Sequence, residues 1–392
     1  MKVRLGDICE VISGSTPKTN VPEYWNGTLK WITPAEIGKE CYIFDSERHI
    51  SEEGAKSANL RPLPPGTVIL SSRAPIGKTA IAGCKLYCNQ GFKNLICSSA
   101  LMPEYLYYFL SCNTHKLNLL GRGATFKELS KSIVENIEIP LINLIQQKYI
   151  VHILQNIDRL ITKYSNACSI LNEIVKSRFM EMFGDLSSPS CRWNKNKLSH
   201  ICVNYDDIKC GPFGTQLNKN EYTATGVPIW EIAQINSMFT TKPVHFITQD
   251  KAVSLNAYSI KPGDIAMSRK GNVGRCAIFP ETLQNGIIHS DILRIRVDQN
   301  QVLPVFIVHQ LRYSNHVKHQ IELVSYGAIM AGINVTKLKQ IEIHIPPLPL
   351  QQQFAAFVEK VDKSKFIVGA RLAGRLYRKV LTKLSLSEAD YD

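Results

Sequence analysis

No run of apolar residues in this sequence approaches the roughly 18–20 residues that a helix needs to cross a bilayer. The N-terminal stretch MKVRLGDICE also lacks the apolar region of a secretory signal peptide. The 11 cysteines include no CxxC pair, and their odd number does not suit a disulfide framework. These absences predict a cytoplasmic protein with free thiols.

Motifs of catalysis are equally scarce. Residues 71–79, SSRAPIGKT, end like a phosphate-binding loop, but Ser72 stands where the first glycine should be and Pro75 removes an amide donor. No Cys or His spacing suits zinc, and no Gly-rich adenosylmethionine loop follows a strand. The sequence therefore predicts no catalytic residue, no metal site and no cofactor in this chain.

The sequence does contain an excess of positive charge. Its 392 residues carry 46 Lys+Arg against 33 Asp+Glu, a formal net charge of +13. Its length suits two to three folding units, and 44% hydrophobic residues are enough for real cores. A moderately basic chain of this kind favours contact with DNA phosphates.

The chain is duplicated. Residues 65–81, PGTVILSSRAPIGKTAI, align without gaps with residues 262–278, PGDIAMSRKGNVGRCAI. Further matches extend in both directions, and the offset between the copies drifts steadily from 193 to about 206. Small loop insertions after a duplication produce such a drift, whereas chance similarities would scatter.

Each copy ends in an Ile-Pro segment followed by a helical pattern. Apolar residues recur at alternating steps of four and three, the spacing of a coiled-coil seam. Gly184 suits the end of the first helix. We predict that the two long helices pack antiparallel, although two independent core helices remain an alternative. The predicted seam comprises Ile150, Leu154, Ile157, Ile161, Tyr164, Leu171 and Val175 on the first helix and Phe354, Val358, Val361, Val368 and Leu372 on the second.

The predicted fold class is α/β, with two tandem α/β domains separated by two long antiparallel coiled-coil helices in a pseudo-two-fold arrangement. Short β-rich runs at 67–72, 264–268 and 292–297 are bounded by turn residues, and residues 103–117 are typical of a helix that begins at Pro103. The predicted boundaries are 1–142 for the first domain, 143–185 for the central helix, 186–348 for the second domain, 349–384 for the distal helix and 385–392 for an acidic tail.

Basic and small side chains gather at the predicted turns of both copies. Arginine can bond guanine bidentately, whereas Lys, Thr and loop amides hold phosphate. Arg73 and the pair Arg269 and Lys270 stand out, because both copies place a cation after a strand that ends in Ser. The predicted DNA-contacting residues are Thr16, Lys18, Arg73, Lys78, Lys93, Arg122 and Lys127 in the first copy, and Lys219, Arg269, Lys270, Arg275 and Arg294 in the second.

The pattern resembles the specificity (S) subunits of type I restriction–modification systems. The matching segments are SSRAPIG (71–77), NQGFKNL (89–95), GATFKELS (123–130) and IPLINLIQQ (139–147) before the first long helix. The second copy departs from them, with SRKGNVG in place of SSRAPIG and HSDILRI in place of NQGFKNL. The resemblance covers nearly the whole chain.

The resemblance implies two target recognition domains, each of which reads one half of a bipartite site in double-stranded DNA. It implies that the helices set the spacing between the half-sites and dock two methyltransferase (M) subunits, with restriction (R) subunits joining for cleavage. S-adenosylmethionine, ATP and Mg²⁺ would then serve the partner subunits. Two alternatives stay open: a stand-alone DNA-binding regulator, and a self-sufficient nuclease built on Asp207 with Lys209 or Asp264 with Lys270.

Overall fold

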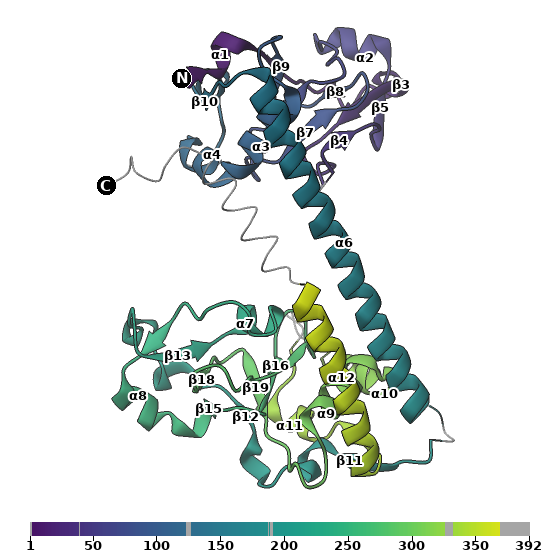
Figure 1. Ribbon diagram of the computed structural model, residues 1–392, viewed down its shortest axis with the longest axis vertical. Helices are drawn as coiled ribbons and strands as arrows, with labels where there is room; N and C mark the ends of the chain where they lie inside the picture. The colour runs from purple at the N-terminus through teal and green to yellow at the C-terminus, as the bar shows by residue number, and fades with distance from the viewer. Residues whose placement is uncertain are drawn as a thin grey trace. The chain divides into compact units, whose positions relative to one another are not determined.

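The computed structural model describes residues 2–38, 40–122, 127–186, 188, 191–325 and 332–368. These residues pack as two units, one extending to Ser165 and the other from Asn166 to Val368. Figure 1 labels their helices and strands. In the described part of the chain, no helix combines the length and the apolar character needed to cross a membrane.

The first unit is built on a five-stranded sheet in the order β2-β9-β6-β7-β4, with a three-stranded sheet β5-β3-β8 and a β1-β10 pair beside it. Its strands are β1 (Lys2–Arg4), β2 (Cys9–Ser13), β3 (Trp25–Ile32), β4 (Tyr42–Ile43), β5 (Arg48–Ile50), β6 (Val68–Ser71), β7 (Thr79–Ala82), β8 (Tyr87–Cys88), β9 (Phe92–Cys97) and β10 (Glu138–Pro140). Its helices are α1 (Leu5–Ile8), α2 (Glu52–Ser57), α3 (Pro103–Cys112), α4 (Thr114–Leu120), α5 (Lys131–Glu135) and the start of α6 (Leu144–Phe183).

The second unit repeats this plan with sheets β12-β19-β16-β17 and β14-β13-β18-β15 and a β11-β20 pair. Its strands are β11 (Asn194–Lys197), β12 (Ile208–Cys210), β13 (Val227–Trp230), β14 (Phe246–Ile247), β15 (Ser259–Ile260), β16 (Ile265–Ser268), β17 (Cys276–Ile278), β18 (Gly286–Ile288), β19 (Ile292–Ile295) and β20 (Glu342–Ile345). Its helices are α7 (Ile232–Asn236), α8 (Gln249–Ser254), α9 (Pro304–Tyr313), α10 (Asn315–Ser325), α11 (Val335–Lys339) and α12 (Leu348–Val368).

The register of the strands confirms the duplication. Strands β3 and β8 pair in parallel through Trp31 and Tyr87, and β13 and β18 pair in parallel through Trp230 and Ile288. Each copy also has an antiparallel hairpin, β6-β7 or β16-β17, that enters from a Pro-Gly turn. Gly66 and Gly263 adopt φ values of +89° and +86° in these turns, a region that glycine enters without steric cost.

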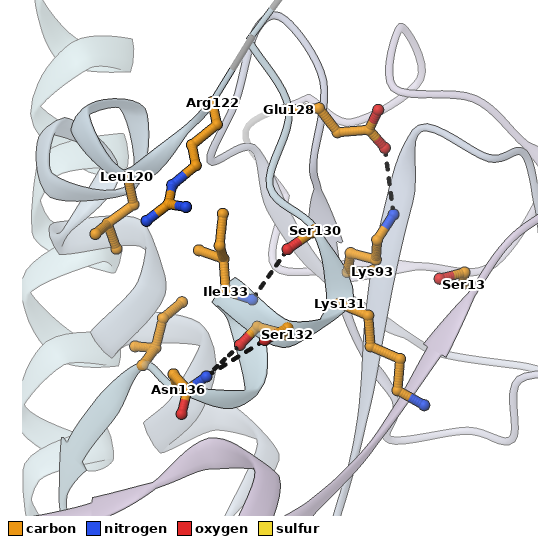
Figure 2. Close-up of a pocket in the computed structure, with 11 residues that line it drawn as sticks. Ser13, Lys93, Leu120, Arg122, Glu128, Ser130, Lys131, Ser132, Ile133 and Asn136 are labelled. Carbon is orange, nitrogen blue, oxygen red and sulfur yellow. Dashed lines mark hydrogen bonds and ion pairs between the residues drawn. The ribbon is translucent and has the colours of Figure 1, made fainter.

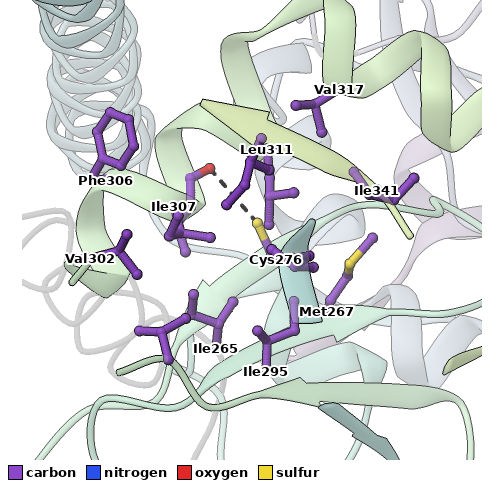
Figure 3. Packing of buried hydrophobic residues seen from close by; sticks show 14 of the residues in the cluster. Ile265, Met267, Cys276, Ile295, Val302, Phe306, Ile307, Leu311, Val317 and Ile341 are labelled. Atoms are coloured by element: carbon purple, nitrogen blue, oxygen red, sulfur yellow. Dashed lines mark hydrogen bonds between the residues drawn. The ribbon is translucent and has the colours of Figure 1, made fainter. Parts of the chain in front are cut away.

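Each domain has its own hydrophobic core. In the second, Ile265 and Met267 of β16, Cys276 of β17 and Ile295 of β19 lie beneath helix α9, which contributes Leu311 (Figure 3). In the first, β6 contributes Val68 and Leu70 to a core that helix α3 covers with Tyr105 and Leu106. The predicted strands at 67–72, 264–268 and 292–297 are confirmed as β6, β16 and β19.

A buried glutamine ties each long helix to its domain in the same way. Gln147 of α6 accepts a hydrogen bond from the Met102 amide (2.8 Å) and donates to the carbonyls of Ala100 (2.9 Å) and Ile142 (2.8 Å). Gln351 of α12 bonds the corresponding backbone groups, with the Leu303 amide at 2.9 Å. Both glutamines are fully buried. The duplication therefore includes the joint between domain and helix.

We expect Gln147→Leu to destabilise the first domain by at least about 2–3 kcal/mol. The change leaves one backbone donor and two carbonyls without their partner in a buried site, and each unsatisfied group costs about 1–3 kcal/mol. Urea unfolding of the full chain measures the loss. The neighbouring Gln146 is exposed, so Gln146→Leu is the control and should change stability by less than about 0.5 kcal/mol. Equal effects of the two substitutions would contradict this role for Gln147.

Helix α6 runs without interruption from Leu144 to Phe183 and ends as predicted at Gly184, which has φ of +75° and donates its amide to the Met180 carbonyl at 2.8 Å. Its C-terminal part lies beside α12 in the second unit (Figure 1). Phe354 meets Phe183 at 5.6 Å between ring centroids, while Arg178 lies over Phe357 at 5.9 Å. Advancing along α12 moves the contact backward along α6, so the two helices pack antiparallel here.

The residues of the predicted helix seam pack in different cores of the structure. Leu171 and Val175 of α6 do pack in one core with Phe354, Val358 and Val361 of α12. The other predicted members are placed as follows: Ile150 and Leu154 pack in the core of the first domain, Ile157 is buried, Tyr164 is half-buried, Ile161 is 38% exposed, and the Val368 side chain and Leu372 lie outside the described residues.

The assignment of Ile150 and Leu154 to a helix–helix seam is therefore corrected. The apolar stripe of α6 packs against two different neighbours. Its first turns cover the first domain, whereas its last turns pack with α12. Helix α3 of the first domain also forms a hydrogen bond with α6. The Tyr108 hydroxyl of α3 donates to Asp158 of α6 at 2.7 Å. Of the predicted distal helix at 349–384, the structure describes α12 up to Val368, and the acidic tail at 385–392 lies outside the described residues.

Acid should loosen this helix pair through His309. The side chain of His309 packs on Phe354 at 5.1 Å between ring centroids, and its burial lowers the pKa from 6.5 to about 4. A lowered pKa means that the folded state binds the proton more weakly than the unfolded state. The stabilisation is therefore complete above about pH 6.5 and disappears as the pH falls toward 4, a loss of about 3 kcal/mol.

We expect His309→Gln to remove the part of the second domain's acid sensitivity that comes from protonation of His309. Urea unfolding at pH 7 and at pH 4.5 provides the measurement, with the wild-type chain as reference. Burial also lowers the pKa values of His316 and His344, so part of the acid sensitivity should persist in the variant. An unchanged difference between the two pH values would contradict the assignment to His309.

Candidate nucleic-acid interface

The turn between β6 and β7 presents Arg73 on a rigid backbone. The Ser71 hydroxyl donates to the Pro75 carbonyl at 2.7 Å and accepts from the Lys78 amide at 2.9 Å. Gly77, with φ of +93°, completes the turn and donates its amide to the Ser71 carbonyl at 3.1 Å. Internal bonds of this kind hold the exposed Arg73 side chain at a fixed point of the domain surface.

The second domain builds the same turn between β16 and β17 and presents Lys270. The Ser268 hydroxyl donates to the Lys270 carbonyl at 2.8 Å, and the Gly274 amide donates to the Ser268 carbonyl at 3.2 Å. Gly274 has φ of +87°, close to that of Gly77. The two copies therefore share the turn geometry although the turn sequences differ.

An acidic residue pairs with the displayed cation in each domain. Arg73 Nε lies 3.1 Å from Glu128 Oε2, and Lys270 Nζ lies 2.9 Å from Asp291 Oδ1. Glu128 comes from the segment before α5, whereas Asp291 comes from the turn before β19. Both cations keep nearly half of their side-chain surface exposed. The acids orient the cations and still leave them accessible to phosphate or base edges.

A basic cavity of about 830 Å³ lies in the first domain (Figure 2), and Glu128, the ion-pair partner of Arg73, is one of its lining residues. Lys93, Arg122 and Lys131 contribute three positive charges to its lining, and Glu128 contributes one negative charge. Lys93 Nζ lies 3.4 Å from Glu128 Oε1 and is nearly buried, so this pair forms one wall. The surplus of positive charge suits an anionic group such as a DNA phosphate.

Comparison with known proteins assigns the chain to a protein family. The family model for the type I restriction modification DNA specificity domain matches residues 1–174 and again residues 193–371. The chain belongs to this family.

Two curated relatives come from Methanocaldococcus jannaschii. The chain is 40% identical over 186 residues to the type I restriction enzyme MjaIX specificity subunit, a match that covers 46% of this chain and 43% of that protein. It is 21% identical over 383 residues to the MjaVIII specificity subunit, covering 92% of this chain and 85% of that protein. The first match thus spans less than half the length of that relative.

Solved structures share the fold. The S subunit of the type I restriction–modification system of M. genitalium superposes with a TM-score of 0.53 at 14% identity, covering 98% of this chain and 95% of that one. A chain from a structural study of the assembly and conformational transition of a type I system gives 0.52 at 16% identity, with the same coverage. These likenesses confirm the predicted arrangement of tandem α/β specificity domains with a long helix.

The other predicted contact residues of the two specificity domains fall into two groups. Lys18 and Lys127 are exposed on loops, and Lys219 is exposed at the start of a short 3₁₀ helix, Lys219–Glu221. Lys78 and Arg275 also reach the surface, but each is anchored by a backbone carbonyl, Lys78 by that of Pro34 at 3.0 Å and Arg275 by that of Asn236 at 2.8 Å. The Gly-Ala-Thr segment at 123–125 lies outside the described residues.

Arg294 is withdrawn from the candidate interface. Its side chain is 4% exposed and donates to the backbone carbonyls of Ser259 at 2.6 Å and Ala257 at 3.3 Å, while burial lowers its pKa. It fills the position of Asn94 on the equivalent strand of the first domain, and both positions point into the fold. Lys93 is likewise nearly buried, and its side chain forms part of the cavity wall.

Sequence reasoning missed several residues of this surface. Glu128 and Asp291, which orient the cations, carry no sign of that role in the sequence. Gln90, in the turn between β8 and β9, and Phe213, in the segment after β12, are both exposed. A position-by-position comparison of the two copies could have identified Phe213, because it aligns with the predicted residue Thr16 at the offset of 197 that Gly14 and Gly211 and the two cation-bearing turns share.

The two carboxylates of the alternative nuclease hypothesis, Asp264 and Asp207, form hydrogen bonds within the fold. Asp264 is buried and binds Arg296 bidentately, with both N–O distances at 2.7 Å. Asp207 accepts from the Asn204 amide at 2.8 Å and so closes a tight turn. Among the described residues, no group of three or more His, Cys, Asp and Glu side chains is arranged to hold a metal ion.

Proposed function

We propose that this chain is the DNA-specificity subunit of a type I restriction–modification complex and that each domain reads one half of a bipartite site. The observation that carries the proposal is the same cation-bearing turn, built once in each domain from different side chains. A duplicated frame with different surface residues suits recognition of two different sequences. Catalysis would belong to partner subunits that use S-adenosylmethionine, ATP and Mg²⁺.

The surface of α6 supports a partner-docking role. Ile145, Tyr149, Leu160 and Ile170 are each 58–83% exposed on this helix. Exposed apolar side chains repeated along one helix favour association with another protein. We propose that two M subunits dock on the long helices and that R subunits join them. A stand-alone regulator has no use for such a surface.

Co-expression of the full chain with a candidate M subunit tests the proposal. We expect a stable complex of two M subunits with one chain, which binds and methylates DNA at a single split sequence. A chain that folds but never associates with an M subunit would refute this function. Metal-dependent DNA cleavage by the purified chain alone would instead favour the nuclease alternative.

Within that complex, Arg73→Ala should weaken recognition of one half-site by about tenfold or more and spare the other. Lys270→Ala should have the reverse effect, because each cation belongs to a different domain. Competition binding with duplexes altered in one half-site at a time provides the readout. Lys363 is an exposed, ion-paired cation on α12, and Lys363→Ala is the matched control. Equal losses at both half-sites would contradict the assignment of these turns.

A further inference from the structure

The two domains hold three loop segments in the same mutual arrangement. Gly14 and Gly211 each lie so close to a neighbouring turn that an added Cβ would be 2.0 Å from the Asn89 carbonyl oxygen or 2.3 Å from that of His289. The cation-bearing turns are bonded to these same turns, with the Ser72 amide donating to Gly91 at 2.7 Å and the Arg269 amide to Asp291 at 2.9 Å. Equivalent backbone positions can therefore be compared directly.

Three positions in each domain converge on one place. The first position lies two residues after Gly14 or Gly211. The second position is the second residue of the cation-bearing turn. The third position directly follows Asn89 or His289, whose carbonyl approaches the glycine. In the first domain these positions hold Thr16, Ser72 and Gln90, and in the second domain they hold Phe213, Arg269 and Ser290. The backbone is shared, but none of the three side chains is.

In the first domain, the exposed side chain is Gln90. The Thr16 hydroxyl donates a hydrogen bond to Gln90 Oε1, which fixes the amide plane. Because Gln90 is exposed, its Nε2 donors and the second lone pair of Oε1 are accessible to a base edge. A side-chain amide presents one donor and one acceptor side by side, the pattern that matches N7 and N6 of adenine in the major groove.

In the second domain, the group at the same place is the Arg269 guanidinium. It stacks over Phe213 at 4.8 Å and donates to the carbonyls of Ile333 at 3.2 Å and Ser290 at 3.3 Å. Nη1 also donates to Cys210 Sγ at 3.7 Å, so these contacts use three of the five N–H donors, fix the plane of the guanidinium and leave the two N–H groups of Nη2. The donors that remain suit two adjacent acceptors, as O6 and N7 of guanine present them.

We propose that Gln90 reads an adenine in one half-site and that Arg269 reads a guanine in the other. Thr16 and Phe213 act as positioning residues that hold the amide and the guanidinium. The inference rests on the proposed function and adds to it the kind of base that each domain prefers. It also explains why the two domains differ at these three positions while they share the turn that carries Arg73 or Lys270.

The test is selection of binding sites from a library of duplexes with randomised positions, using the complex of the full chain with its M subunit. We expect Gln90→Ala to lose about 10- to 100-fold of preference at one A·T pair and to leave the other half-site unchanged. Gln90→Glu presents only acceptors and should turn that preference toward cytosine. Gln146→Ala, an exposed glutamine on α6, is the matched control.

Arg269→Lys keeps the positive charge and loses the bidentate fork, so it should relax one G·C pair without altering the salt dependence of binding. Thr16→Val should reproduce part of the Gln90→Ala effect, and Thr16→Ser should restore the wild-type preference. Unchanged consensus sequences in the Gln90 and Arg269 variants, or relaxation at other base pairs, would overturn the inference. A wild-type complex that selects no split sequence would instead defeat the proposed function itself.

Discussion

Deleting one heptad from the middle of α6, residues 160–166, is expected to reduce binding and methylation of the wild-type DNA site by at least about 100-fold. The helix is continuous from Leu144 to Phe183, and its two ends belong to different domains. Seven residues shorten it by about 10 Å, which corresponds to about three base pairs of DNA. Most of the deleted residues are exposed, so neither domain core loses a side chain.

The deletion nearly preserves the rotation of the helix, because seven residues are close to two full turns. DNA, by contrast, rotates by about 100° over three base pairs. The variant should therefore bind the original site poorly, and library selection should recover a shorter gap between the same two half-sites. Both half-site sequences are expected to remain unchanged. The same gap preference in the deletion variant and in the wild-type complex would contradict the role of α6 as a spacer.

Phe179→Ala should destabilise the second domain by about 3–5 kcal/mol. Phe179 is fully buried and lies between three elements: its ring centroid is 5.4 Å from Phe354 of α12, 5.8 Å from Phe306 of α9 and 5.0 Å from Phe183 of its own helix. Removing the ring leaves a cavity at the point where α6 and α12 meet. A loss of this size is a large share of the 5–15 kcal/mol that stabilises a typical domain.

Urea unfolding followed by tryptophan fluorescence measures this loss, because Trp193 and Trp230 both lie in the second domain. Ile170 is an apolar residue of the same helix that is 60% exposed, so Ile170→Ala is the control and should cost less than about 1 kcal/mol. Phe179→Leu, which keeps most of the volume, should fall between the two. A small effect of Phe179→Ala would show that the helix pair does not depend on this aromatic contact.

The duplication made much of the fold predictable from the sequence. Pro-Gly turns, runs such as VILS at 68–71 and the glycine at 184 depend on local backbone preferences, and the structure places strand β6 and the end of α6 at these points. The predicted helix at 103–117 is interrupted at Asn113, whose side chain donates to the Phe109 carbonyl at 2.8 Å. That bond competes with the continuing helix and leaves α3 and α4 as separate elements.

The interface was harder to predict because it depends on which side chains meet in space. The sequence identifies Arg73 and Lys270 as cations after equivalent strands, but their acidic partners come from different segments of the two copies. Arg294 has the composition of a contact residue and is instead buried among backbone carbonyls. A heptad pattern likewise does not reveal which element the helix packs against, since Leu154 packs in the core of the first domain and Val175 packs with helix α12.

Single-molecule mapping of methylated bases tests the central claim most directly. DNA from cells that express this chain together with an M subunit should carry methylation at one split motif, with two different blocks of specified bases at a constant distance. Methylation at one uninterrupted motif, despite a stable complex between the chain and the M subunit, would contradict the claim that the two domains read separate half-sites.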